Sequence, residues 1–136
     1  MKFADASAIS YRTPGTRHRE GNIEFKYLLT GEAGSPRNYE LSIVRTQDHF
    51  ESPAHRHNFD QIRYVLSGAF GEKGPLELKP GEVGYYPEGT PYRISSGNSE
   101  VLLLQFGGAS GAGSGVAWSP IVRRGRPVRG CRRCIS

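Results

Sequence analysis

Short strand-like segments separated by turn residues run through the first 106 residues, and this spacing limits the fold more than any other feature. The segments recur about every 8–12 residues, which is typical of β-sandwiches and β-barrels. Eighteen Gly and nine Pro in 136 residues favour tight turns over long helices, so we expect an all-β fold. The expected strands cover residues 23–30, 39–46, 69–73, 83–86, 92–95 and 101–106, together with one strand that enters at 49–53 and continues through the histidines to 60–66.

Two histidines one residue apart, His55 and His57, are the strongest chemical signal. Side chains on a strand alternate between its faces, so both imidazoles point the same way, and Gln61 and Arg63 follow on that face. If the strand lines a small barrel, the imidazoles converge inside it, which predicts a metal site. Gln61 stands where a carboxylate ligand would be expected. The alternative is a pair of hydrogen-bonded barrel histidines without metal.

Arg63 is the second candidate on the inward face. A charged side chain inside a small barrel must be paired or must meet an anionic ligand, because a lone buried charge costs several kcal/mol. The functional interpretation is a clamp for a carboxylate or phosphate of a substrate. The alternatives are an internal ion pair with Asp60 or Glu72, or a bulge that turns Arg63 outward.

The net charge of +5 is concentrated after residue 115. Residues 1–115 hold all thirteen acids and twelve of the eighteen bases, a net charge of −1, whereas residues 116–136 hold six arginines and no acid, a net charge of +6. The folded part therefore offers no basic surface, and we expect no nucleic-acid partner. Binding of nucleic acid by the arginines of the tail is the alternative.

The composition divides the chain into one domain, a linker and a tail. Residues 1–106 are long enough for a single core. Residues 107–115 are all Gly, Ala or Ser, which is a flexible linker composition. We expect the Arg-rich tail, 116–136, to be disordered. An equally abrupt change would arise if the reading frame had shifted after residue 115, so this alternative stays open.

Compartment and membrane contact are also predicted from the sequence. No apolar run approaches the ~20 residues that cross a bilayer, so we expect no membrane partner. An acid, Asp5, stands where a signal peptide needs apolar residues. The two cysteines, Cys131 and Cys134, lie near the C-terminal end rather than through the domain, unlike those of a disulfide-built secreted protein. We expect a cytoplasmic protein.

Two motifs resemble those of the cupins. The first cupin motif reads His-x-His, three or four residues, Glu, six residues, Gly. The second begins with Gly and ends Pro-x-Gly, two residues, His. The resemblance covers roughly residues 40–106, with the motifs in 49–95, and implies a double-stranded β-helix of the jelly-roll type. The matching positions are His55, His57, Gln61 and Gly68 in the first motif, and Gly81, Pro87, Gly89 and Tyr92 in the second.

The resemblance also implies a metal centre with two exchanged ligands. Metal-binding cupins typically use three histidines and one glutamate, whereas this chain has Gln61 at the glutamate position and Tyr92 at the third histidine position. We expect His55, His57 and Gln61 to hold a divalent transition metal, which the donor types leave open among Fe, Mn, Ni, Cu and Zn. Tyr92 is the candidate catalytic acid; a metal ligand and a wall residue bonded to Gln61 are its alternatives.

These observations support two functional hypotheses. The first is a metal-dependent cupin that acts on a small-molecule ligand, with Arg63 favouring an anionic one, by dioxygenase, lyase or isomerase chemistry. The second is a metal-free binding module that uses the same cavity without catalysis. In either case we expect a homodimer, because a one-domain jelly roll gains core by burying an outer sheet face.

Overall fold

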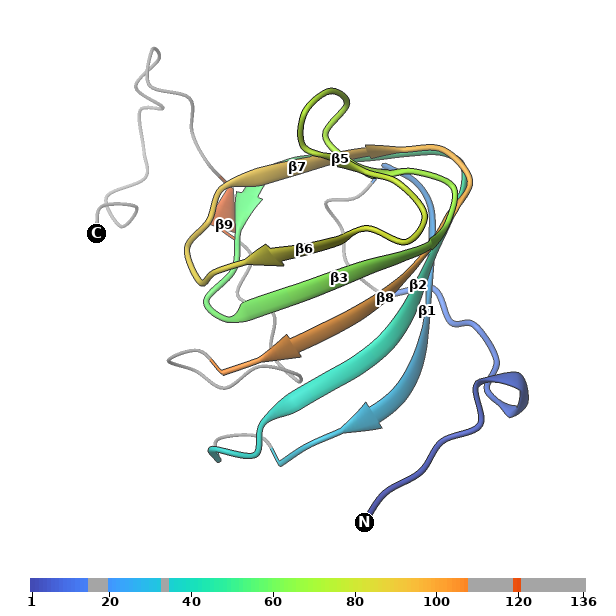
Figure 1. The fold of residues 1–136 in the computed structure, drawn as a ribbon, viewed down its shortest axis with the longest axis vertical. Coiled ribbons are helices and arrows are strands. Elements are labelled where there is room, and N and C mark those ends of the chain that lie inside the picture. The colour runs from blue at the N-terminus through green and yellow to red at the C-terminus, as the bar shows by residue number, and fades with distance from the viewer. Residues whose placement is uncertain (15–19, 33–34, 108–118, 121–136) are drawn as a thin grey trace.

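The computed structural model describes residues 1–14, 20–32, 35–107 and 119–120. Within them the regular structure is almost entirely β, as the turn spacing predicts, and the single helical element is a 3₁₀ turn, η1 (Ala6–Ala8). Figure 1 shows the strands wrapped around one interior. The strands are β1 (Glu20–Thr30), β2 (Tyr39–Arg56), β3 (Asp60–Ser67), β4 (Phe70–Gly71), β5 (Glu77–Leu78), β6 (Val83–Tyr86), β7 (Tyr92–Ser96), β8 (Ser99–Phe106) and β9 (Ser119–Pro120).

The strand β2 belongs to both layers of the barrel (Figure 1). The large layer has the order β1-β2-β8-β3-β6, and the second half of β2 leaves it to pair with β7. The strand turns at Asp48, which lies in a bulge against β1 and has a φ of 59°. Aspartate tolerates this left-handed conformation better than most residues do. The bend therefore carries one strand from the large layer to the layer that holds the histidines.

The expected continuous strand through the histidines is wrong at residues 57–59. β2 ends at Arg56, and the chain bends through His57, Asn58 and Phe59 before β3 begins. β3 then pairs with β8 and β6 instead of extending β2. The bend places the histidines and the Gln61–Arg63 segment on either side of it, facing the same interior. These side chains therefore point inward as predicted, although they do not lie on one continuous strand.

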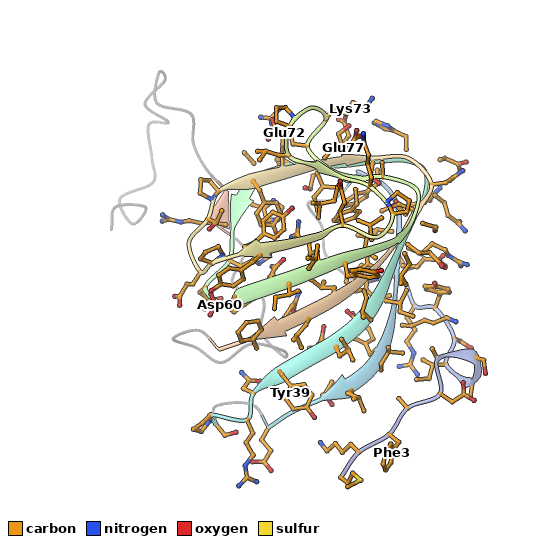
Figure 2. The ribbon with its side chains drawn as sticks, viewed as in Figure 1. Phe3, Tyr39, Asp60, Glu72, Lys73 and Glu77 are labelled. Atoms are coloured by element: carbon orange, nitrogen blue, oxygen red, sulfur yellow. The ribbon has the colours of Figure 1, made fainter. Side chains whose placement is uncertain are left out.

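The interior changes from apolar to polar along the barrel. Gln61, Gln105 and Glu40 are neighbours across β3, β8 and β2, and all three are buried. Their strands end together at the left in Figure 2, where Asp60 is labelled at the start of β3. Beyond this polar row the core is mainly hydrocarbon, and at the far end Thr46, Ser96 and Ser99 form a buried cluster of hydrogen-bonded hydroxyls. The core cluster is Ile23, Phe25, Val44, Phe50, Val65, Phe70, Ile94, Val101 and Leu103.

The outer face of the large layer is apolar over β3 and β6. Tyr64, Leu66 and Val83 are exposed there. The N-terminal segment packs elsewhere on this face, where Tyr11 donates a hydrogen bond of 2.6 Å to Glu100. It thus leaves the apolar part open to solvent, and an exposed apolar patch commonly marks an interaction surface.

Parts of the sequence-based predictions fall outside the described residues. Cys131 and Cys134 do so, as do the expected linker beyond Gly107 and all of the Arg-rich tail except 119–120. Their expected properties stay predictions. The described residues include no helix of the length and apolarity that a membrane crossing requires.

Candidate functional site

The two histidines meet inside the barrel. His55 lies on β2 and His57 in the bend that follows it, and both are buried. Their ring centroids are 4.9 Å apart and the rings are almost perpendicular. Both rings line a cavity of about 40 Å³, together with Gln61, Arg63 and Tyr92. All five predicted site residues therefore border one cavity, which has room for about three waters.

A hydrogen bond to the backbone determines that Nδ1 of His55 carries a proton. Its Nδ1 lies 2.7 Å from the carbonyl oxygen of Pro53, and a carbonyl only accepts. Nδ1 therefore carries a proton, and in the neutral ring the lone pair lies on Nε2. This is the tautomer in which a histidine ligates a metal or accepts a proton through Nε2.

The side-chain oxygen of Gln61 is engaged by Arg63. Oε1 accepts hydrogen bonds from Nε and Nη2 of Arg63 at 3.1 and 2.6 Å. It also receives a longer contact of 3.4 Å from the Tyr92 hydroxyl. Because a guanidinium only donates, the amide atom that faces it must be the oxygen. The atom that would ligate a metal is thus already bonded to a cation.

Arg63 is a buried cation without a carboxylate. It is 3% exposed, and within the described residues no acidic side chain forms an ion pair with it. The acids proposed as alternatives are engaged elsewhere: Asp60 accepts from the Tyr85 hydroxyl and from a backbone amide, and Glu72 pairs with Arg93. The guanidinium nitrogen Nη1 is buried with no hydrogen-bond partner in the described part of the chain.

Aromatic rings compensate part of the Arg63 charge. The guanidinium carbon lies 4.2 Å from the ring centroids of both Tyr86 and Tyr92. Desolvated cation–π contacts of this kind contribute about 2 kcal/mol, which is less than the cost of burying an unpaired charge. The environment of Arg63 therefore favours binding of an anion.

Tyr92 lies between the two groups. It pairs with His55 across β7 and β2, with ring centroids 4.5 Å apart, and its hydroxyl reaches toward Gln61. The phenol is thus placed to give a proton to a ligand held between the imidazoles and Arg63, as a general acid must be. The same contact with Gln61 also fits the alternative of a wall residue.

The donors fit a transition metal only in part. The imidazole pair fits, because both rings border the cavity and His55 has its lone pair on Nε2. The oxygen donors fit only if Gln61 leaves Arg63, and the buried guanidinium repels a cation. No group of three or more His, Cys, Asp or Glu side chains that could hold a metal occurs in the described residues.

Sequence reasoning missed Glu40 and Gln105. Gln105 lines the cavity, and Glu40 is its neighbour on β2. Burial raises the pKa of Glu40 to about 7. Strand parity indicates the opposite, because the sequence pattern would turn the apolar Leu41 and Ile43 inward, whereas the structure buries Glu40 on the inner face. An acid at the start of a strand also usually lies at the surface, so the sequence does not mark Glu40 as a site residue.

Comparison with known proteins shows the fold. No protein-family model matches the sequence, and no curated protein matches it significantly. An acetylacetone dioxygenase from Acinetobacter johnsonii is 13% identical, with 87% of this chain and 85% of that chain covered and a TM-score of 0.67. The polyketide cyclase RemF from Streptomyces resistomycificus is 19% identical, with 77% of this chain and 78% of that chain covered and a TM-score of 0.63. An RmlC-like cupin from Shewanella frigidimarina is 16% identical, with coverages of 77% and 88% and a TM-score of 0.58.

These likenesses confirm the expected fold, an all-β jelly-roll barrel of the cupin type. At these identities the likeness shows the fold, and the same fold hosts many different reactions.

The raised pKa of Glu40 predicts how stability depends on pH. The usual value of 4.5 applies in the unfolded chain, and the folded value is about 7. The folded state therefore keeps a proton that the unfolded state releases, so this stabilisation is full below pH 4.5 and is lost as the pH rises through 7. Between pH 5 and pH 8 we expect the wild type to lose about 2 kcal/mol of unfolding free energy relative to Glu40→Gln.

Denaturant titrations at both pH values measure this difference. Glu32→Gln, at an exposed acid, is the matched control and should follow the wild type. If Glu40→Gln loses as much stability as the wild type on going to pH 8, the carboxyl is not protonated in the folded protein.

Proposed function

We propose that this chain, which has the cupin fold, binds a small organic anion inside its barrel and pairs the anionic group with Arg63. One observation carries the proposal: a buried guanidinium has no carboxylate partner among the described residues, and its Nη1 has no hydrogen-bond partner there. A carboxylate of the ligand would supply the missing charge and the missing acceptor. Arginine suits this task because its planar fork matches a carboxylate with two parallel hydrogen bonds.

The size of the cavity limits the group that pairs with Arg63. A volume of about 40 Å³ admits a carboxylate or a similar group of a few atoms, but not a large ring system. The lining supports one orientation. The anionic head lies at Arg63, and the atoms next to it face His55, His57 and Tyr92, which are the groups that can exchange protons.

Tyr92 is the residue that we propose as the catalytic acid, should the bound molecule react. Its hydroxyl is near Gln61 and its ring lies against His55, so it borders both the anionic head and the imidazoles. Support for an enzyme comes from the similar structures, which include a polyketide cyclase and a dioxygenase. A binding module without catalysis is the alternative, since it needs only the cavity and Arg63.

A transition metal at the imidazole pair is the second candidate, and the His55 tautomer favours it. His55 and His57 would hold the ion, and Gln61 would join them after leaving Arg63. A metal bound there would supply Lewis acidity to polarise an oxygen of the ligand. Gln61 then couples anion binding to metal binding, because its Oε1 either accepts hydrogen bonds from Arg63 or ligates the metal. An anion that pairs with Arg63 would release Gln61.

We also propose that two copies associate through the apolar outer face of β3 and β6. Tyr64, Leu66 and Val83 present exposed apolar side chains there, and β6 is an edge strand of the large layer. Burial of these side chains against a second copy would add the core that a small barrel lacks.

Replacement of Arg63 tests the anion site. In Arg63→Met the packing volume stays and the charge is lost, so we expect acetate binding, measured by isothermal titration calorimetry, to weaken at least about tenfold. Stability should be kept or improved, because an unpaired buried charge is removed. Arg56→Met, which removes an exposed charge from β2, should bind acetate as the wild type does. Equal acetate binding by Arg63→Met and the wild type would contradict the proposal.

Metal uptake tests the second candidate. Untagged protein incubated with Zn²⁺ or Ni²⁺ and then dialysed should retain about one ion per chain, and His55→Ala should retain none, because the imidazole pair supplies the only nitrogen ligands proposed. Arg63→Met should bind the ion more tightly than the wild type, since Gln61 is released and a repelling charge is gone. If elemental analysis finds no retained ion in either the wild type or Arg63→Met, the metal candidate is contradicted. The imidazoles would then act only in proton transfer.

A charge on the outer face tests the dimer. The wild type should elute with twice the mass of one chain when size exclusion is coupled to light scattering. Leu66→Asp combined with Val83→Asp should shift the mass to that of a monomer, because two carboxylates would be buried without partners. Phe3→Asp is the control at an apolar residue far from this face and should leave the mass unchanged. A monomeric wild type at 100 μM would exclude the proposed interface.

A further inference from the structure

A second hollow lies beside the barrel cavity and is mostly apolar. It has a volume of about 290 Å³ and lies between the β4–β5 hairpin and the strands β6 and β7. Leu76 is 66% exposed on the hairpin side, and Tyr85 is 58% exposed on β6. Large apolar side chains gathered around a groove are typical of a binding site for an apolar group. The apolar and aromatic lining is Pro75, Leu76, Leu78, Tyr85, Tyr86, Pro91 and Tyr92.

The groove is adjacent to the Arg63 site. Tyr92 lines both the groove and the cavity. The rings of Tyr86 and Tyr92 are 5.3 Å apart, and each lies against the Arg63 guanidinium. One layer of tyrosine rings therefore separates the groove from the buried cation.

The charges at the rim indicate which end of a ligand the groove can hold. Arg93 lines the groove but already pairs with Glu72, with an N–O distance of 3.8 Å. Glu72, Lys73 and Glu77 all lie on the hairpin, as Figure 2 shows. Together with Arg93 these side chains give two acids and two bases, so the rim has no net charge; an anion is favoured at the uncompensated Arg63, and an uncharged apolar group in the groove.

The two hollows differ in size as well as in polarity. The cavity of about 40 Å³ holds an anionic head of a few atoms, whereas the groove of about 290 Å³ holds a ring. A larger ligand whose head pairs with Arg63 must place its remainder outside the cavity. The neighbouring apolar surface that Tyr92 shares offers that place.

We infer that the groove beside Tyr92 binds the apolar ring of a ligand whose carboxylate pairs with Arg63, so that the ligand class is an amphipathic ring-bearing carboxylate rather than a small polar acid. The inference rests on the proposed anion site and adds a second subsite to it. Because the tyrosine rings form the wall between the two hollows, the Tyr92 ring turns aside when the ligand binds, and the ligand then has its carboxylate inside the barrel and its apolar ring between the hairpin and β6. Tyr86, Pro91 and Leu76 contact the ring.

Two probes that differ only in the apolar part test the inference. Acetate reports on the Arg63 site alone, and 3-phenylpropionate reports on both subsites. Isothermal titration calorimetry should show that the wild type binds 3-phenylpropionate at least about tenfold more tightly than acetate, because burial of an aromatic ring is favourable. Equal affinities would overturn the inference.

A matched pair of exposed apolar residues locates the ring. Leu76→Ser removes a groove contact and should weaken 3-phenylpropionate binding about fivefold without changing acetate binding. Phe3→Ser changes an exposed apolar residue far from the groove, at the lower right in Figure 2, and should change neither affinity. If Leu76→Ser loses no more affinity for 3-phenylpropionate than Phe3→Ser does, the phenyl ring binds elsewhere. That result would overturn the inference.

The outcomes separate this inference from the proposed function. If acetate binds through Arg63 but 3-phenylpropionate binds no better, the anion site stands and the groove inference fails. If neither probe binds the wild type, the proposed function fails, and the inference fails with it. If 3-phenylpropionate binds equally well to Arg63→Met, the groove acts without the anionic anchor, and the two-part ligand is excluded.

Discussion

A guanidinium held inside a small barrel is the constraint on which the rest of this site depends. Arg63 takes the carbonyl oxygen of Gln61 and the faces of Tyr86 and Tyr92, and these contacts fix the position of all three side chains. None of them carries a negative charge, so the compensation is incomplete. The imidazoles, the phenol and the amide are thereby arranged around a place where an anion is favourable.

The inner face of the large layer is polar near the start of β3, and its outer face is apolar near the end of β3. Glu40, Gln61 and Gln105 lie on the inner face, while Leu66 and Val83 lie on the outer face. A polar interior keeps a cavity open because water and ligands can hydrogen-bond there, and an apolar exterior gains from contact with another surface. One pattern of side chains thus supports both the proposed ligand site and the proposed contact between copies.

Much of the fold and part of the site were predictable from local rules. Turn spacing and the two motifs indicate the barrel, and strand parity turns His55 and Arg63 inward. The bend at residues 57–59 was missed because it contains neither Gly nor Pro. The direction of the Gln61 oxygen depends on a side chain of the same strand, and the pKa of Glu40 depends on burial by residues far away in sequence. Spacing alone cannot predict either, since both arise from tertiary packing.

The bend of β2 at Asp48 has a mechanical consequence. A single run of backbone contributes to the outer sheet and, after the bend, to the histidine wall, so the two layers are covalently tied and cannot slide past each other. The two parts join at Asp48, whose backbone holds a left-handed conformation that is uncommon for residues other than glycine. A substitution at Asp48 that disfavours this conformation would therefore disturb the outer sheet and the histidine wall together.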